Sequence, residues 1–271
     1  MIDLYTGTPG SGKSLHMAHQ IKEDLRWGKN VISTSPIDTK LCFMSGFAEW
    51  LFNISKGKIR LYKPDKREKN FHYIDIKDIT PDYLYEFAAR HHKFGKEHQT
   101  TIYLDECVAI FSPTVLTEKI WNEWDTFFRK HRHLGFDVVL IPQSPRLISR
   151  KVKEYAEHEI KHYNRKNHGL FGLFLSLVLG SLFSYSVCWR GTREAPISQG
   201  FFMYKPLYGQ MYNSYCMFDE TLLPYKEAYR KKQEAAAALC AALIQRSEQL
   251  EILEKSRSSD CCLSDNSVFC D

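Results

Sequence analysis

Residues 7–14 constrain the fold of this chain more than any other segment, because they join a short apolar stretch to a helical pattern. They match the phosphate-binding pattern G-x-x-x-x-G-K-[ST]. The residues of this loop are Gly7, Thr8, Pro9, Gly10, Ser11, Gly12, Lys13 and Ser14. Its glycines allow successive backbone N–H groups to point inward at a helix N-terminus. The pattern predicts that Lys13 contacts nucleotide phosphates and that Ser14 offers its hydroxyl to Mg²⁺; the alternative is a glycine-rich turn that binds nothing.

A second informative segment is residues 101–106, where four residues that favour strands precede two carboxylates, Asp105 and Glu106. Such a strand in a P-loop protein predicts that Asp105 belongs to the Mg²⁺ shell. Glu106 is predicted to polarise the attacking water as a general base. The alternative is a strand that ends in two solvated acids.

A basic helix and a further strand follow. Residues 118–134 have a helical pattern closed by Gly135, and the last turns carry Arg129 and Arg132. Cations favour a helix C-terminus; the sharper alternative is an arginine finger, with Arg132 ahead of Arg129, that reaches a nucleotide on a neighbouring subunit. The strand at 136–141 leads to Gln143, which we expect to sense the γ-phosphate unless it is only a polar loop cap.

Shorter patterns predict the other elements. A helix is expected over 41–52, strand and loop over 56–70, and a strand over 71–76. Thr80 followed by Pro81 predicts the start of a further helix.

Composition favours one large α/β domain with a real core, since the 271 residues are 44% hydrophobic and 25% charged. The formal net charge of +5 is compatible with nucleic acid or an acidic membrane surface and requires neither. The chain enters its first strand without a signal-peptide pattern, so we expect the N-terminal domain in the cytoplasm. Cysteines gathered near the C-terminus are either disulfides or free thiols.

Five regions are expected along the chain. They are a P-loop domain over 1–168, an apolar segment over 169–189, an aromatic-rich strand and turn extension over 190–220, a helix over 221–255 and a disordered tail over 256–271. The uncharged apolar segment, as a helix rising about 1.5 Å per residue, would reach about 31 Å, enough to span a bilayer core. The alternative for this segment is two buried strands with a hairpin turn at Gly180-Ser181.

The P-loop, the strand ending in Asp105 and Glu106, the turn containing Arg132 and the strand leading to Gln143 stand in an order that resembles the zonula occludens toxin family. This family includes the assembly ATPases of filamentous bacteriophages. The resemblance covers about residues 1–165 well and 200–218 weakly. It implies a P-loop NTPase fold of the RecA/FtsK-HerA kind, with a mainly parallel sheet flanked by helices.

The resemblance also implies an ATPase that uses ATP and Mg²⁺ and works as a homo-oligomeric ring at the host inner membrane, with its ATPase domain in the cytoplasm. Its implied partners are phage coat and assembly proteins and single-stranded DNA, and its implied role is to drive assembly and extrusion of the phage. Two alternatives stay open. One is a soluble, cytoplasmic P-loop DNA translocase or packaging factor, and the other is a nucleotide-gated scaffold that does not depend on turnover.

Overall fold

The computed structural model describes residues 1–167, 182–190 and 196–212. All of these belong to one compact unit, Met1–Met217. The predicted helix over 221–255, the predicted tail over 256–271 and the cysteines near the C-terminus lie outside the described residues.

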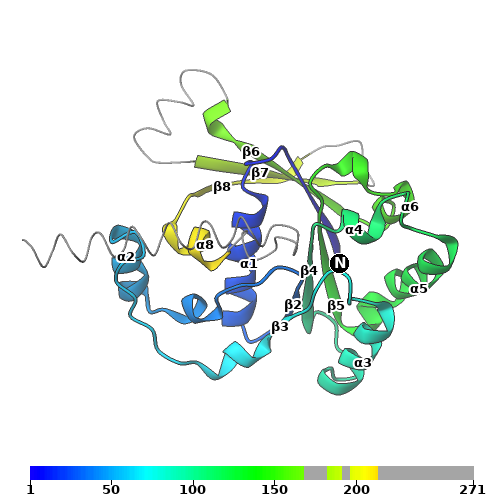
Figure 1. The fold of residues 1–271 in the computed structure, drawn as a ribbon, viewed down its shortest axis with the longest axis horizontal. Helices are drawn as coiled ribbons and strands as arrows, with labels where there is room; N and C mark the ends of the chain where they lie inside the picture. Colours follow the sequence, from blue (N-terminus) through cyan, green and yellow to red (C-terminus); the bar gives the residue numbers. More distant parts are fainter. Residues whose placement is uncertain (168–181, 191–195, 213–271) are drawn as a thin grey trace, which may run out of the picture. The chain divides into compact units, whose positions relative to one another are not determined.

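One sheet organises this unit, and in the described part of the chain it has eight strands in the order β3-β2-β4-β5-β1-β6-β7-β8 (Figure 1). The strands are β1 (Ile2–Thr6), β2 (Asn30–Ser33), β3 (Phe71–Tyr73), β4 (Thr100–Asp105), β5 (Phe136–Ile141), β6 (His158–Asn164), β7 (Leu182–Trp189) and β8 (Pro196–Met203). The first six are parallel, and β7 and β8 join antiparallel at one edge. The predicted α/β class with a mainly parallel sheet is therefore confirmed.

Helices cover both faces of this sheet (Figure 1). One face carries α1 (Lys13–Arg26), α2 (Gly46–Ile54) and α8 (Pro206–Met211), together with the 3₁₀ turn η1 (Thr39–Phe43). The other carries α3 (Pro81–His91), α4 (Val108–Phe111), α5 (Glu118–Leu134) and α6 (Arg150–Lys153). Three further 3₁₀ turns complete the described elements: η2 (Lys66–Asn70), η3 (Pro145–Leu147) and η4 (Arg165–Asn167).

The neighbouring interior strands β4 and β5 are buried at every position, as expected for parallel strands covered on both faces. Alternate side chains enter opposite cores: Leu104 packs with α3 and α5, whereas Tyr103 packs with α1. This double coverage explains why apolar residues fill the middle of both strands, at 102–104 and 138–141.

Strand order places three segments at one edge of the sheet. β5 lies between β1 and β4, and all three strands run in the same direction. Their carboxyl ends are Thr6, Asp105 and Ile141. The residues that follow these ends therefore meet, although they lie far apart in the sequence.

The start of α3 and the end of α5 agree with the sequence-based predictions. Thr80 accepts a hydrogen bond from the Tyr83 N–H at the start of α3, with Pro81 in the first turn. Gly135 ends α5 with a left-handed φ of 88°. The expected helix over 41–52 is instead η1 followed by α2, because the Ser45 side chain caps α2 at the Ala48 N–H. The expected strand within 56–70 is wrong, since that stretch is loop followed by η2.

The predicted transmembrane helix over 169–189 is wrong in its second part, where residues 182–189 form strand β7. This strand pairs with β6 on one side and β8 on the other, so the sheet satisfies its backbone groups. Residues 169–181 lie outside the described residues, and no helix in the described part is long and apolar enough to cross a membrane. The sheet thus continues past the predicted domain boundary at 168, and the extension over 190–220 supplies β8 and α8.

Candidate functional site

Residues 7–12 form a tight loop between β1 and α1. The Ser11 N–H donates to the Thr8 carbonyl (3.0 Å), and Gly12 caps α1 with a left-handed φ of 94°. A Cβ atom added to Gly12 would lie 2.8 Å from the ring of Phe183, so the position excludes larger residues by backbone angle and by space. Helix α1 begins at Lys13, and the unpaired N–H groups of its first turn open into this loop as an anion site.

Lys13 lies across the concave side of the loop. Its ammonium donates to the Gly7 carbonyl (2.8 Å) and more weakly to the Thr8 carbonyl (3.4 Å). Burial lowers the pKa of Lys13, and the charge of Asp105 opposes that shift. The lysine is thus held where a phosphate bound by the loop would meet it.

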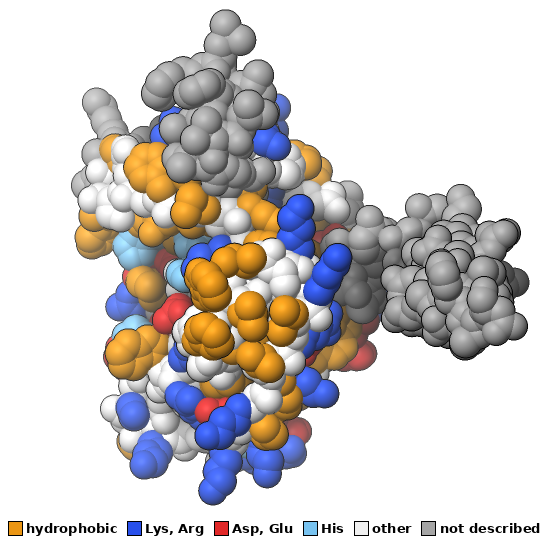
Figure 2. Space-filling model, turned by 90° about the vertical axis from the view of Figure 1, so that its left-hand side faces the viewer, with side chains coloured by type: hydrophobic (Ala, Val, Ile, Leu, Met, Phe, Trp, Pro, Cys, Tyr) orange, Lys and Arg blue, Asp and Glu red, His pale blue; other side chains and the backbone are white. Residues whose placement is uncertain are grey.

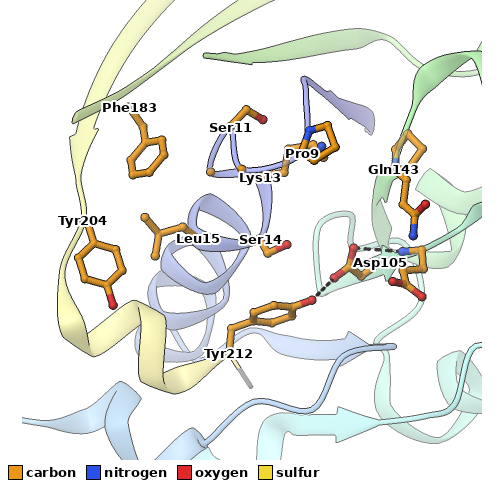
Figure 3. Close-up of a pocket in the computed structure, with 14 residues that line it drawn as sticks. Pro9, Ser11, Lys13, Ser14, Leu15, Asp105, Gln143, Phe183, Tyr204 and Tyr212 are labelled. Atoms are coloured by element: carbon orange, nitrogen blue, oxygen red, sulfur yellow. Dashed lines mark hydrogen bonds between the residues drawn. The ribbon is translucent and has the colours of Figure 1, made fainter. Parts of the chain in front are cut away.

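Asp105 ends β4 with its carboxylate buried and heavily hydrogen-bonded (Figure 3). Oδ2 accepts from the Ser35 hydroxyl (3.0 Å) and the Tyr212 hydroxyl (3.1 Å), and Oδ1 accepts from the Glu106 N–H (3.0 Å). Burial raises the pKa of Asp105, and the hydrogen bonds from Ser35, Tyr212 and the Glu106 N–H oppose this. The backbone N–H of Asp105 donates to the Thr34 hydroxyl (2.9 Å), which fixes the strand end.

Glu106 takes a left-handed backbone conformation, with φ of 54°. This region costs a residue with a Cβ about 1–2 kcal/mol, and such outliers persist where the surrounding structure enforces them, often at functional sites. The side chain is exposed and lines the same pocket as Lys13.

These groups line one pocket with a volume of about 620 Å³ at the carboxyl edge of the sheet. Its lining residues are Pro9, Gly10, Ser11, Gly12, Lys13, Ser14, Leu15, Asp105, Glu106, Pro142, Gln143, Phe183, Tyr204 and Tyr212. The structure therefore brings the predicted loop, both acids and Gln143 together (Figure 3).

Sequence reasoning missed the aromatic side of this pocket. Phe183 comes from β7, and Tyr204 and Tyr212 flank α8. Phe183 lay in the segment expected to span a membrane, so no pattern tied it to the P-loop. Ser35 was also missed; it follows β2, and no sequence pattern tied it to the P-loop.

The chemistry of the donors fits Mg²⁺, which prefers hydroxyl and carboxylate oxygens together with substrate phosphates. Ser14 and Asp105 supply one of each, and both line this pocket. Among the described residues, no group of three or more His, Cys, Asp and Glu side chains could hold a metal. A metal in this pocket would therefore need nucleotide phosphates to complete its ligands.

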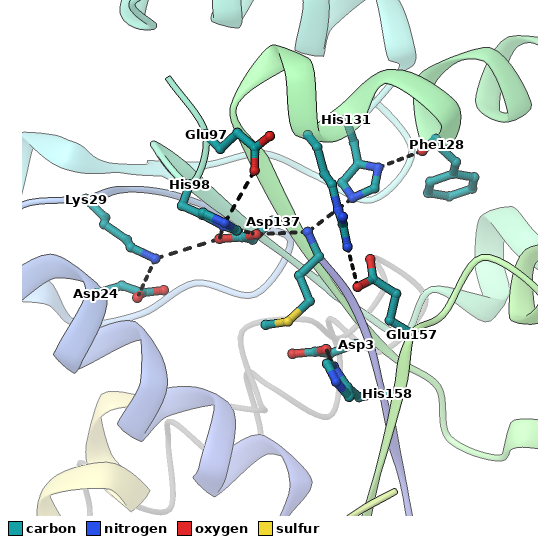
Figure 4. A network of polar contacts seen from close by, with 12 residues as sticks. Asp3, Asp24, Lys29, Glu97, His98, Phe128, His131, Asp137, Glu157 and His158 are labelled. Atoms are coloured by element: carbon teal, nitrogen blue, oxygen red, sulfur yellow. Dashed lines mark hydrogen bonds and ion pairs between the residues drawn. The ribbon is translucent and has the colours of Figure 1, made fainter. Parts of the chain in front are cut away.

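Arg132 lies away from this pocket, at the opposite edge of the sheet. It precedes β5 and pairs with Glu157, which precedes β6. Glu157 lies beside the network around Asp137 and His131 (Figure 4). Arg129 is likewise engaged, by Asp125 (3.0 Å) and the Tyr155 hydroxyl (3.2 Å). Arg132 therefore does not reach the nucleotide site of its own chain, and its contact with a neighbouring subunit stays a prediction.

Comparison with known proteins gives one family match. The model of a family described as "Zonular occludens toxin (Zot)" matches residues 1–182. No curated protein matches the chain.

Several solved structures are similar in fold. The N-terminal domain of zonular occludens toxin from Neisseria meningitidis shares 18% identity, covering 78% of this chain and 98% of that one, with a TM-score of 0.44. B204, the DNA-packaging ATPase from Sulfolobus Turreted Icosahedral Virus, shares 16% identity over 73% and 98%, with a TM-score of 0.41. A KaiC-like protein from Pyrococcus horikoshii OT3 shares 15% identity over 76% and 86%, with a TM-score of 0.45.

Proposed function

This chain belongs to the zonular occludens toxin family, and on that premise we propose that it is a Mg²⁺-dependent ATPase that drives assembly and extrusion of a filamentous phage. The observation that carries the enzymatic part is that Lys13 and Glu106, from different elements, line one pocket. An anion-binding loop alone would bind a nucleotide. A carboxylate facing the same space supplies a base for hydrolysis.

Each group has a distinct task in the proposed reaction. The loop N–H groups and Lys13 bind the phosphates, and Ser14 and Asp105 hold the metal ion. Mg²⁺, when bound, neutralises charge on the phosphate oxygens. Glu106 accepts the proton of the attacking water, while Gln143, after β5, contacts the γ-phosphate or that water and orients it.

The partners belong to the same proposal. We propose that copies of the chain form a ring at the host inner membrane and act on single-stranded DNA and on phage coat and assembly proteins. Family membership supports this assignment. Arg132, exposed on the basic end of α5, is the residue we expect at the contact between neighbouring copies.

A surface over α2 supports attachment to the membrane from the cytoplasmic side. Phe47, Trp50 and Ile54 are 68%, 57% and 61% exposed at helical spacing. Exposed Lys56 and Lys58 follow directly, and Figure 2 shows hydrophobic side chains gathered on this face with lysine and arginine around them. Aromatic side chains beside cations favour the interface of an anionic bilayer.

The enzymatic proposal is tested with Glu106→Gln in the purified full chain. We expect the wild type to release phosphate from ATP with Mg²⁺, and Glu106→Gln to bind ATP with turnover lowered about a hundredfold or more. Lys13→Ala should lose binding. A wild-type chain that binds no nucleotide would overturn the proposal.

The role in phage release is tested in cells where particle production depends on this chain. If Glu106→Gln stops particle release, turnover drives assembly. If release persists with ATP bound, the chain is a nucleotide-gated scaffold and the motor proposal fails.

The membrane surface is tested by co-sedimentation with vesicles. Vesicles rich in phosphatidylglycerol should retain the wild type, and the double variant Phe47→Ser, Trp50→Ser should be released. Trp27→Ser is the matched control, because Trp27 is 82% exposed but lies at the end of α1. Equal binding by the double variant and the control would remove this support and favour a cytoplasmic location.

A further inference from the structure

Tyr212 follows directly on α8 and reaches into the pocket with its hydroxyl (Figure 3). The hydroxyl donates to Asp105 Oδ2 (3.1 Å), and Ser14 lines the same pocket. Tyr212 therefore bonds to Asp105, one of the two side chains that the proposed function assigns to Mg²⁺, in the pocket that Ser14 also lines. Burial raises the pKa of Tyr212, so the phenol stays a proton donor at neutral pH.

Of the side chains and N–H groups described above as donors to the Asp105 carboxylate, Tyr212 is the one that closes the pocket. Ser35 follows β2 and is not among the pocket-lining residues, and the Glu106 N–H belongs to the backbone directly after β4. The Tyr212 phenol comes from the end of α8, on the pocket side. A metal ion that must reach Ser14 and Asp105 competes with this phenol.

We propose that Tyr212 is a latch on the metal side of the nucleotide pocket, closed in this structure and opened when a magnesium–nucleotide complex takes Ser14 and Asp105. This inference depends on the proposed function, because it uses the same two residues as metal ligands. Because Tyr212 follows α8 directly, the position of α8 then depends on whether a magnesium–nucleotide complex is bound.

Anchors around Tyr212 connect the latch to the rest of the fold. Leu207 and Met211 are buried in the core beside α1. The Met211 carbonyl accepts from the Asp38 N–H (3.0 Å), and Tyr212 forms a β-bridge with Ile37. Loss of the Asp105 bond removes the anchor nearest the nucleotide, and the segment after β2 continues to hold the end of α8.

The decisive variant is Tyr212→Phe in a Glu106→Gln background, in which bound ATP is not turned over. With excess Mg²⁺, we expect the Kd of a fluorescent ATP analogue to fall about three- to tenfold, since the complex no longer displaces a hydrogen bond to a carboxylate. In EDTA, the Kd should be unchanged. Tyr208→Phe is the matched control: it makes the same change within α8 at a position outside the pocket lining, and should alter neither value.

Hydrogen exchange gives a second readout that needs no substitution of the tyrosine. Magnesium–ATP added to the Glu106→Gln chain should speed exchange of amides in residues 206–212 and leave those of α5 unchanged.

The possible results distinguish a failure of the latch proposal from a failure of the proposed function. Weaker magnesium-dependent binding by Tyr212→Phe would show that the phenol positions Asp105 for the metal, and unchanged binding would show no role; either overturns the latch while the nucleotide site stands. Unchanged or slower exchange at 206–212 also overturns it. No nucleotide binding by any variant would overturn the proposed function itself.

Discussion

The Nδ1 atom of His16 on α1 lies 2.8 Å from the Nε2 atom of His162 on β6, in the core directly beneath the P-loop. The His162 Nδ1 atom lies 3.2 Å from the Thr6 carbonyl, so it donates there and its Nε2 atom accepts. His16 must then donate through Nδ1 and accept from Gln20 through Nε2 (3.3 Å). The network thus defines the tautomers of two neutral imidazoles that tie α1 and β6 to the end of β1.

We expect this pair to make stability fall with acid. Burial lowers the pKa of His16 to about 3 and that of His162 to about 4. Unfolded histidines titrate near pH 6.5. The contribution of the two neutral histidines to the free energy of unfolding is therefore full above pH 6.5, and it is lost as the pH falls from 6.5 toward their pKa values in the folded protein. The free energy of unfolding in urea should drop between about pH 6.5 and 4.5, with a limiting slope of about 1.4 kcal/mol per pH unit for each such histidine.

His16→Gln tests the source of this slope, since glutamine can still donate to His162 while it does not titrate. The slope should become shallower in this variant. His133→Gln, on the exposed side of α5, should leave it unchanged. Identical slopes in the wild type and His16→Gln would refute the assignment.

The left-handed backbone at Glu106 predicts that this residue lowers the stability of the fold, although the proposed reaction needs it. Asparagine accepts this conformation more readily than glutamine. We therefore expect Glu106→Asn to be more stable than Glu106→Gln by up to about 1 kcal/mol, with neither hydrolysing ATP. Urea unfolding of the two variants measures the difference, and a less stable Asn variant would contradict the strain at this residue.

Glu49 should contribute to stability through the buried ammonium of Lys22. The Lys22 Nζ atom lies 2.6 Å from the Glu49 carboxylate, and the lysine side chain is only 2% exposed. Burial lowers the pKa of Lys22, and the hydrogen bond that Lys22 donates to Glu49 opposes this. Glu49→Gln leaves this cation without its carboxylate, so we expect a loss of about 2–3 kcal/mol in urea unfolding.

Glu86→Gln is the control for this pair. Glu86 pairs with Arg90 on α3, but both side chains are largely exposed, at 67% and 72%. Its loss should be below about 0.5 kcal/mol. Equal losses in the free energy of unfolding for Glu49→Gln and Glu86→Gln would mean that Lys22 pairs with another group when Glu49 is replaced.

Gly12→Ala should damage the P-loop through the ring of Phe183. Gly28 provides the comparison, because it also has a positive φ (78°), but an added Cβ there meets no atom of the described chain within 4 Å. Gly28→Ala therefore measures backbone strain alone, about 1 kcal/mol. We expect Gly12→Ala to lose more stability than Gly28→Ala, together with nucleotide binding measured by calorimetry.

In a Phe183→Ala background, Gly12→Ala should lower the free energy of unfolding by less than it does in the wild type, because the ring that an added Cβ would meet is gone. The part of the loss that is due to φ should remain. Equal losses in the two backgrounds would mean that the ring moves aside freely.

The phosphate-binding loop, the two acids and Gln143 could be predicted because each depends on neighbours in the sequence. Glycines at 7, 10 and 12 specify a local backbone path. Buried parallel strands are recognisable as apolar runs, and polar residues that follow them fall at a common edge. The strand order, with β5 between β1 and β4, was still needed to bring Gln143 beside Asp105.

Other features of the site could not be found in this way. An apolar run such as 169–189 has the composition of a membrane helix, and only its pairing with β6 and β8 makes residues 182–189 a strand. Arg132 looked like a nucleotide contact by its charge and helix position. The direction of β5 places it at the edge opposite the pocket, where it pairs with Glu157.

The sequence by itself determined which chemical groups this site contains: a loop with the phosphate-binding pattern, the hydroxyl of Ser14 and the carboxylates of Asp105 and Glu106. These are encoded in short segments whose geometry is set by neighbouring residues. The tertiary structure alone decided what surrounds that chemistry. Phe183, Tyr204 and Tyr212 reach the pocket through the antiparallel edge of the sheet and α8. Contacts of that kind depend on packing between distant segments, which no local pattern records.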